Sequence, residues 1–368
     1  MARAVRTNER RRLLLGLAGS GLLASCAVAP PEPAAKEDQG DRLWPAPPEL
    51  PRFAYETALR TLGDITEETE QEKLRNRLTG VRRADGKVIE KPASIAARDG
   101  RIFVGDSIRR SVLVFDVPRR KVFQFGLRAP GILAKPTAIA LDRGGRLYVA
   151  DATLRKVFVY DRLGLHLQTI GQPGELQRPT GVAASPDGSR VYVIDRSDND
   201  SDQHRVTIYG ADGKVLREVG RRGRGDGEFN LPVQAAVGPG GTLHVLDAGN
   251  FRVQSFDAEG RFLRSFGQVG TGLGRFARPR NLACDDEGRL YVSDGAFGNV
   301  QIFTPEGALL LAIGRGSRRD LPGCYGLVSG VAVDETGRIY VADQLFSKVE
   351  VLRRVGEQEG RKLQQAAA

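Results

Sequence analysis

The sequence is poor in the side chains that most often carry chemistry. Its 368 residues include three Cys, three His, one Met and one Trp. Metal centres and nucleophilic sites draw mainly on His, Cys and carboxylates, so these counts leave little room for a catalytic cluster. No Cys-x-x-Cys-His haem motif is present. Glycine, in contrast, is abundant at 45 residues, which suits a chain of many short strands and turns.

The N-terminus has the features of an export signal. Residues 1–12 are basic, residues 13–23 are apolar but shorter than the ~20 residues that span a bilayer, and small residues follow. This pattern predicts a cleaved signal peptide over residues 1–25. Those residues carry a net charge of +4, so the rest of the chain keeps +6 of the total +10. That bias is mild, and together with export it argues against a nucleic-acid partner.

The segment from Leu23 to Cys26 (LASC) resembles the bacterial lipobox, in which the Cys thiol is lipidated before cleavage in front of it. The resemblance implies that Cys26 anchors the mature chain to a membrane. The alternative is an ordinary Cys beside a plain signal cleavage site. Ala27 follows, not Asp, which by the usual sorting rule implies the outer membrane if the cell is Gram-negative. Arg10-Arg11-Arg12 fits a twin-arginine signal and a generic basic region equally well.

A Pro-rich stretch follows the lipobox. Pro favours extended polyproline geometry, so we expect residues 26–51 to be a membrane spacer without packed structure.

From residue 92 onward the chain repeats itself. The clearest copies are residues 136–171, 232–267 and 279–314, and a partial copy covers 329–354. Each contains a segment of the type Leu-Tyr-Val-x-Asp, and the Asp recurs every 44–52 residues at Asp106, Asp151, Asp195, Asp247, Asp294 and Asp343. The runs between them are rich in β-branched and aromatic residues and are separated by Asp-Gly or Glu-Gly turns. Such a period predicts propeller blades of four antiparallel strands.

The signature of Pro, Gly-Arg-x-Tyr-Val-x-Asp, Arg-Val-x-x-Phe-Asp and a terminal Gly resembles the NHL repeat family over residues 92–354. The resemblance implies an all-β, six-bladed β-propeller over residues 52–354. The sixth copy lacks its outer strand, and residues 53–63 resemble the missing strand. We therefore expect residues 52–63 to complete the last blade and remove an exposed sheet edge. Residues 64–91 would connect to the first blade, with a helix at Thr66–Leu78, and 355–368 would form a polar tail.

Candidate catalytic residues are few. In the NHL family the repeated Asp holds the following turn through backbone amides, so we interpret the six Asp residues as scaffold. Some six-bladed relatives are metal-dependent lyases or lactonases, which need several ligands at the channel. Here His166 is expected in a turn between outer strands, His204 in an inserted loop and His244 in the second strand of blade four. We expect no catalytic residues and no cofactor; a metal-assisted hydrolase or lyase at the channel mouth is the alternative.

Two further features have competing interpretations. The insertion in blade three carries alternating acids that are a Ca²⁺ candidate, Asp198, Asp200 and Asp202. It lacks the Gly and the bidentate Glu of a calcium loop, so a solvated acidic loop is the preferred interpretation. Cys284 and Cys324 are expected as two buried free thiols, with a disulfide as the alternative.

Basic residues gather in the loops that this topology places on one face. The inter-blade loops contribute Arg128, Lys135, Arg178, Arg221, Arg222, Arg224, Arg275, Arg278, Arg280, Arg315, Arg318 and Arg319. The loops after the second strands contribute Arg109, Arg110, Arg155, Lys156, Arg205, Arg252 and Lys348. This basic face predicts a non-enzymatic binding scaffold for an envelope protein or an acidic polysaccharide. The alternative is a solvated charged surface.

Overall fold

The computed structural model describes residues 38, 40–66, 70–80 and 86–366. The predicted signal peptide and the lipidation residue Cys26 lie outside these residues. Gln39–Ala368 form one unit, which is almost entirely β-structure. None of the described helices is both long enough and apolar enough to cross a membrane.

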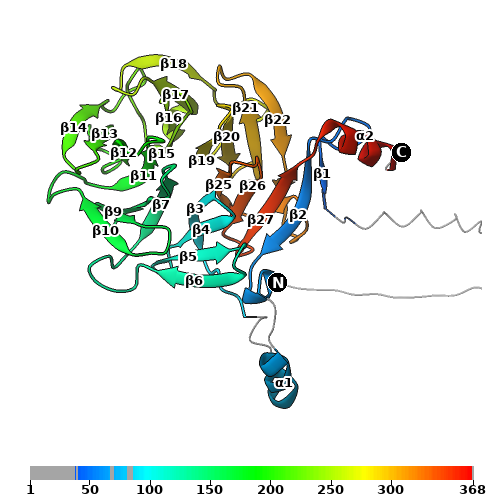
Figure 1. Ribbon diagram of the computed structural model, residues 1–368. Coiled ribbons are helices and arrows are strands. Elements are labelled where there is room, and N and C mark those ends of the chain that lie inside the picture. The colour runs from blue at the N-terminus through cyan, green and yellow to red at the C-terminus, as the bar shows by residue number, and fades with distance from the viewer. Residues whose placement is uncertain (1–37, 39, 67–69, 81–85, 367–368) are drawn as a thin grey trace, which may run out of the picture. The chain divides into compact units, whose positions relative to one another are not determined.

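Five four-stranded sheets and one five-stranded sheet, all antiparallel, follow one another around a common axis (Figure 1). The first blade contains β3 (Pro92–Arg98), β4 (Arg101–Asp106), β5 (Ser111–Asp116) and β6 (Lys121–Phe125). The second contains β7 (Pro136–Leu141), β8 (Leu147–Asp151), β9 (Lys156–Tyr160) and β10 (His166–Ile170). The third contains β11 (Pro179–Ala184), β12 (Arg190–Asp195), β13 (Arg205–Gly210) and β14 (Val215–Val219).

The remaining blades repeat this order. The fourth contains β15 (Pro232–Val237), β16 (Leu243–Asp247), β17 (Arg252–Phe256) and β18 (Phe262–Phe266). The fifth contains β19 (Pro279–Cys284), β20 (Leu290–Asp294), β21 (Asn299–Phe303) and β22 (Leu309–Ile313). The sixth contains β25 (Val328–Val333), β26 (Ile339–Asp343), β27 (Lys348–Arg354) and β2 (Phe53–Leu59). The predicted six-bladed propeller fold is therefore confirmed.

The ring is closed by β2, as the sequence predicts. It pairs antiparallel with β27, from Phe53 opposite Arg354 to Leu59 opposite Val349. The innermost strands contact one another in sequence around the axis, and β25 contacts β3 to complete the circle. The outer edge of blade six is thus covered by a segment from the other end of the chain.

Local sequence chemistry explains the blades. The second and third strands are buried along nearly their whole length, whereas outer strands such as β18 alternate between exposed and half-buried residues. Hydrophobic clusters form where neighbouring blades face each other. The expected turn glycines adopt positive φ, with values of 78° at Gly213 and 82° at Gly260.

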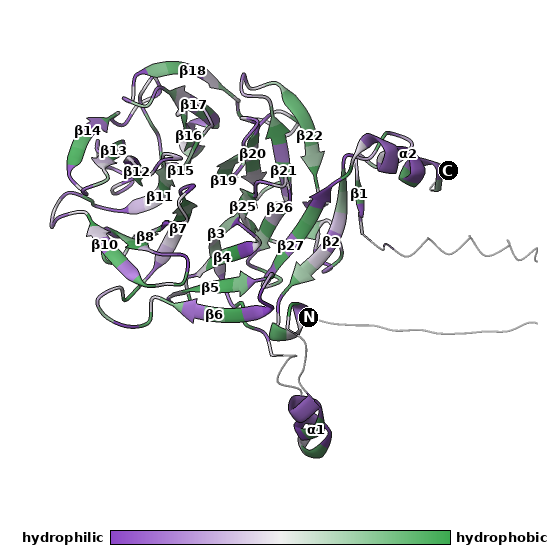
Figure 2. Cartoon of the chain, viewed as in Figure 1, coloured by the Kyte–Doolittle hydropathy of each residue, from purple (hydrophilic) through white to green (hydrophobic). Residues whose placement is uncertain are grey.

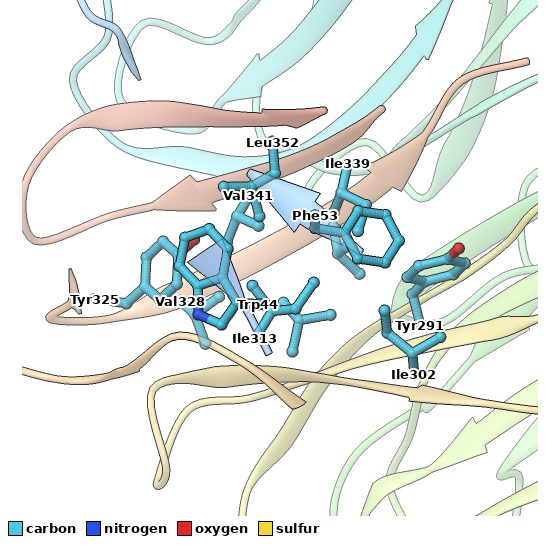
Figure 3. Close-up of a cluster of buried hydrophobic side chains, with 12 residues drawn as sticks. Trp44, Phe53, Tyr291, Ile302, Ile313, Tyr325, Val328, Ile339, Val341 and Leu352 are labelled. Carbon is cyan, nitrogen blue, oxygen red and sulfur yellow. The ribbon is translucent and has the colours of Figure 1, made fainter. Parts of the chain in front are cut away.

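The prediction that residues 26–51 hold no packed structure is wrong for their C-terminal part. Leu43–Trp44 form β1, which adds a fifth strand to blade six beside β2. The Trp44 side chain is 5% exposed and packs with Phe53 and Val328 (Figure 3). Burying one large indole offsets the entropy of ordering a short Pro-rich segment.

Two helices lie outside the blades, and Figure 2 shows that both are largely hydrophilic. The connector holds α1 (Glu70–Thr79), which overlaps the predicted helix. The region expected to be a polar tail instead forms α2 (Glu357–Ala366). Gly360 lies directly against Pro51, and Glu359 pairs with Arg353 of β27, so the helix packs beside blade six.

Candidate anion-binding site at one end of the channel

The innermost strands enclose a cavity of about 170 Å³ on the propeller axis. Every inner strand contributes an alanine at the same level, Ala96, Ala140, Ala183, Ala236, Ala283 and Ala332. Two amides project from the same strands. Gln234 Oε1 accepts from the Val182 amide at 3.1 Å, and Asn281 Oδ1 accepts from the Val331 amide at 3.3 Å. These contacts link blade three to four and blade five to six.

The two ends of the propeller differ in their loops. We call the end where each second strand finishes the loop face; it carries the inter-blade loops and the turns between second and third strands. The other end, the turn face, carries the remaining turns within blades. The cavity extends toward the turn face, where Arg98, Arg143, Asp286 and Glu335 line it. Arg143 and Asp286 form an ion pair of 3.0 Å there.

The repeated Asp residues organise the loop face. Asp151 is typical: it is fully buried and accepts the amides of Ala134 and Lys135, each at 2.7 Å, and those of Thr153 and Leu154. One carboxylate thereby fixes both the loop that enters its blade and the turn after its second strand. The predicted scaffold role of these Asp residues is confirmed.

Four basic residues occupy one structural position around this mouth of the channel. Each immediately precedes an inner strand and donates its backbone amide to the buried Asp of its blade: Lys91, Lys135, Arg178 and Arg278. Their side chains are exposed. Because the first strands surround the axis, these residues ring the channel mouth, and we call them the cation ring. None of the four side chains forms an ion pair with a carboxylate among the residues that the structure describes.

Two half-buried arginines lie beside this ring. Arg196 follows Asp195 and donates its amide to the Arg178 carbonyl at 3.2 Å, while Arg280 lies two residues after Arg278. Burial, followed by the charge of Arg178, lowers the pKa of Arg196. Burial and the charge of Arg278 likewise lower the pKa of Arg280. Arg196 Nε is buried without a hydrogen-bond partner. This mouth therefore combines clustered positive charge with unmet donor capacity, which suits an anionic group.

On the turn face, many of the arginines are paired instead, with exceptions among the described residues such as Arg162. Arginines there pair with nearby carboxylates, as in Arg101–Asp116, Arg146–Asp142, Arg190–Glu259, Arg261–Asp257, Arg289–Asp285 and Arg338–Glu56. Several of these carboxylates also accept backbone amides of their own turns. More cations remain without a carboxylate partner on the loop face than on the turn face, among the residues described. A polyanion should therefore bind more favourably at the loop face.

The other predicted basic residues divide into two groups. Several are already paired: Arg109 with Glu90, Arg205 with Glu218, Arg221 with Glu228, Arg252 with Asp247 and Arg315 with Asp41. Arg319 lies in a loop where its amide bonds to Ser317. Others reach solvent without a carboxylate partner among the described residues: Arg110, Arg128, Arg155, Lys156, Arg222, Arg224, Arg275 and Arg318. The basic residues available to a ligand are thus only some of those that the sequence predicts for this face.

The prediction that Lys348 belongs to this surface is wrong. Its side chain is 1% exposed and pairs with Glu350 at 2.8 Å and with Asp320 at 3.2 Å. Its ammonium also lies over the ring of Tyr325. The loop between β22 and β25 covers it, so Lys348 contributes to the interior of blade six.

The structure does not bring the Ca²⁺ candidates together. No group of three or more His, Cys, Asp or Glu side chains suited to a metal is found within the described ranges. In the insertion, the Asp198 carbonyl accepts from the Ser201 amide and contacts His204 Nε2. His166 begins β10, and His244 lies in β16 hydrogen-bonded to Ser255 at 2.9 Å. The three His therefore lie in separate surroundings.

Both described cysteines are free thiols, so the alternative of a disulfide is not realised. Cys324 is buried in β24 (Cys324–Tyr325), which pairs with β23 (Arg315–Gly316). Cys284 lines the axial cavity, where burial raises the pKa of its thiol to about 12.

Sequence reasoning missed Lys91 and Arg196 as members of this site. For Lys91 the signal was present, because Lys135, Arg178 and Arg278 occupy the same repeat position. Arg196 directly follows Asp195, a position that is not basic in the other blades. Membership of the ring depends on the register of each residue with its inner strand, which loop positions in the sequence do not reveal.

Comparisons with known proteins support the fold. No family model matches the chain, and no curated protein matches it. Among solved structures, a gluconolactonase from Xanthomonas campestris has 20% identity and a TM-score of 0.54, covering 82% of this chain and 98% of its own. A virginiamycin B lyase from Staphylococcus aureus has 13% identity and a TM-score of 0.53, with coverage of 82% and 100%. The hydrazine synthase of Kuenenia stuttgartiensis has 16% identity and a TM-score of 0.52, with coverage of 74% and 97%. At these identities the likeness extends to the propeller fold alone.

Proposed function

We propose that this chain is an exported, lipid-anchored protein of the NHL-propeller type that binds an anionic partner through its loop face without catalysing a reaction. Cys26 would carry the lipid, and the cation ring would supply the main contacts. The observation that carries the proposal is the ring itself: four exposed cations at one repeat position, none paired with a carboxylate among the described residues.

The charge pattern supports binding over simple solvation. Isolated surface cations are common, but here Arg196 and Arg280 are half-buried next to further arginines, and the pKa of each is lowered. Such a cluster costs free energy until an anion compensates it. The buried Asp residues fix the backbone of the cation-ring residues, so binding should cost little conformational entropy of the backbone.

The solved structures with a similar fold include a gluconolactonase and a lyase. The alternative function, a metal-assisted hydrolase or lyase, would need metal-ligating side chains at the channel. Among the described residues no such group is assembled. The function that the geometry supports best is therefore anion binding.

A polyuronate oligosaccharide titration tests the proposal. The lipidated protein in non-ionic detergent is titrated by calorimetry at several salt concentrations. The paired substitution Arg178→Gln and Arg278→Gln removes half of the ring. The matched control, Lys121→Gln with Arg162→Gln, removes two exposed turn-face cations that likewise have no carboxylate partner within the described ranges.

We expect micromolar or weaker affinity that falls with salt, and at least a tenfold loss in the ring variant because each ring cation contributes Coulomb energy. The control should change affinity less than twofold. Equal losses in both variants, or affinity that ignores salt, would refute the cation ring as the binding site.

A further inference from the structure

One sector of the loop face combines apolar tips with cations. In blades six, one and two, the turn after the second strand places a large aliphatic side chain in solvent. Ile108 is 59% exposed, Leu154 is 37% exposed and Leu345 is 60% exposed. The loop from blade one to blade two adds exposed Leu127 and Ile132. These blades are contiguous, because β25 of blade six contacts β3 and β3 contacts β7.

Cations that pair with no carboxylate in the described part of the chain flank these tips. Arg110 and Arg155 follow Ile108 and Leu154 in the same turns, and Arg128 follows Leu127. Lys91 and Lys135 of the cation ring belong to the same blades. An aliphatic tip beside an arginine matches a membrane interface, where acyl chains and phosphate groups lie only a few ångströms apart.

The acidic residues near this sector are paired with cations, as Glu90 is with Arg109 and Asp41 with Arg315. Asp198, Asp200 and Asp202 belong to the insertion of blade three, outside the sector of blades six, one and two. An anionic surface would therefore be attracted to the sector and repelled by the insertion. The charge distribution selects which part of the loop face approaches such a surface.

The first residues of the propeller unit, around Gly40, also lie on the loop face. Asp41 donates its amide to the Pro322 carbonyl at 2.8 Å and pairs with Arg315 at 3.1 Å. Gly40 lies against Leu321 and Pro322. This loop precedes blade six on the loop face. Gly40 lies 14 positions after Cys26, and an extended chain of that length reaches at most about 50 Å. A lipid on Cys26 would keep the membrane within that reach of this end of the propeller.

We propose that the loop-face sector of blades six, one and two rests on the anionic lipid surface to which the chain is tethered. The proposal rests on the proposed lipidation of Cys26 and deepens the proposed anion binding by naming a phospholipid leaflet as the partner. The aliphatic tips enter the headgroup region, and Lys91, Lys135, Arg110 and Arg155 contact lipid phosphates.

Fluorescence quenching in vesicles tests the orientation. The full lipidated chain carries an environment-sensitive fluorophore at Ile108→Cys on the loop face or at Leu163→Cys on the turn face. Both positions are aliphatic and exposed, at 59% and 56%. The protein without an added cysteine measures background labelling. Vesicles contain brominated lipids with either phosphatidylcholine alone or 30% phosphatidylglycerol.

We expect at least threefold stronger quenching at position 108 than at position 163 in the anionic vesicles, with the difference lost in 0.5 M salt. Equal quenching at the two positions, or quenching at position 108 that ignores phosphatidylglycerol, overturns the proposal.

Vesicle flotation of the unlipidated Cys26→Ser protein provides an independent measurement. Arg110→Gln with Arg155→Gln should weaken partitioning about fivefold per charge removed, since one basic residue near an anionic surface contributes about that factor. Lys121→Gln with Arg162→Gln should leave it unchanged. Equal partitioning of both variants overturns the proposal.

Two further readouts separate this inference from the proposed function. Mass spectrometry of the mature N-terminus detects the lipid on Cys26, and its absence refutes the lipoprotein proposal itself. If the polyuronate titration succeeds while both vesicle experiments fail, the loop face binds a soluble polyanion and the membrane orientation alone is refuted.

Discussion

The guanidinium of Arg143 and the carboxylate of Asp286 meet at 3.0 Å although they belong to blades two and five, which oppose each other in the ring. Both side chains line the axial cavity. Their ion pair therefore crosses the turn-face end of the channel.

Replacing Arg143 by Ala should open this end of the channel. Cys284 lines the same cavity, so its thiol should react with iodoacetamide several times faster at pH 8.5. The pKa near 12 keeps the absolute rate low in both proteins. Peptide mass spectrometry measures the rate, and buried Cys324 is the internal control. Stability should fall by less than about 1 kcal/mol, because the pair is solvent-exposed. An unchanged rate at Cys284 contradicts the bridge as a barrier.

Lys348 and Glu350 form a buried pair, so removing one partner should be costly. Glu350 also accepts the Gly323 amide at 2.8 Å and the Tyr325 hydroxyl at 2.9 Å. Lys348→Met should lower the free energy of unfolding by about 3–5 kcal/mol, because an uncompensated carboxylate remains inside. The double variant with Glu350→Gln should recover part of that loss. Urea unfolding provides the measurement, and a double variant no more stable than Lys348→Met argues against the pair.

The closing strand can be monitored by the only Trp in the chain. Trp44 and Phe53 share one core cluster, so Phe53→Ala should destabilise the protein by about 3–5 kcal/mol. The red shift of Trp44 emission should then occur at a lower urea concentration. Arg52→Ala, an exposed neighbour, is the control and should shift the midpoint little. Identical midpoints for both variants are inconsistent with closure through this cluster.

His244 should make stability depend on pH. Burial, with a smaller contribution from Arg264, lowers its pKa from 6.5 to about 4. The unfolded chain binds the proton below pH 6.5 and the folded chain only near pH 4, so stability falls as pH drops through this window. The loss amounts to at most about 3 kcal/mol. Phe103 occupies the equivalent position of blade one, which makes His244→Phe a conservative test.

Urea unfolding at pH 7 and pH 4.5 measures this effect. The wild-type protein should lose more stability between the two values than the His244→Phe variant. An equal loss in both proteins assigns the pH dependence to other groups.

The propeller and its closure were predictable because each blade repeats its own chemistry. Residues 53–63 resemble the outer strands of other blades, so their place in blade six followed from the pattern. The packing of Trp44 was not predictable, because a two-residue strand leaves no periodicity in a Pro-rich segment. The α2 helix has few apolar residues, and its position depends on contacts with Pro51 and Arg353.

Exposure of individual basic residues depends on tertiary structure. Lys348 occupies the same position opposite the buried Asp as the partly exposed Lys156 of blade two, and only the folded loop before β25 buries it. Arg178 and Arg278 were identified as basic-face residues, but their alignment into a ring required the register between each inner strand and its buried Asp. The sequence pattern thus identified the loop face as basic. The packing of the strands determines which of its basic side chains are exposed and can bind a ligand.

The pairing of β2 with β27 means that the sixth blade can be finished only by a chain that already has its final strand. A nascent or truncated polypeptide lacking residues 348–354 would present β26 and β2 as two open edges, both able to capture strands from other molecules. The pairing of the two ends of the propeller is therefore the step that removes both open edges.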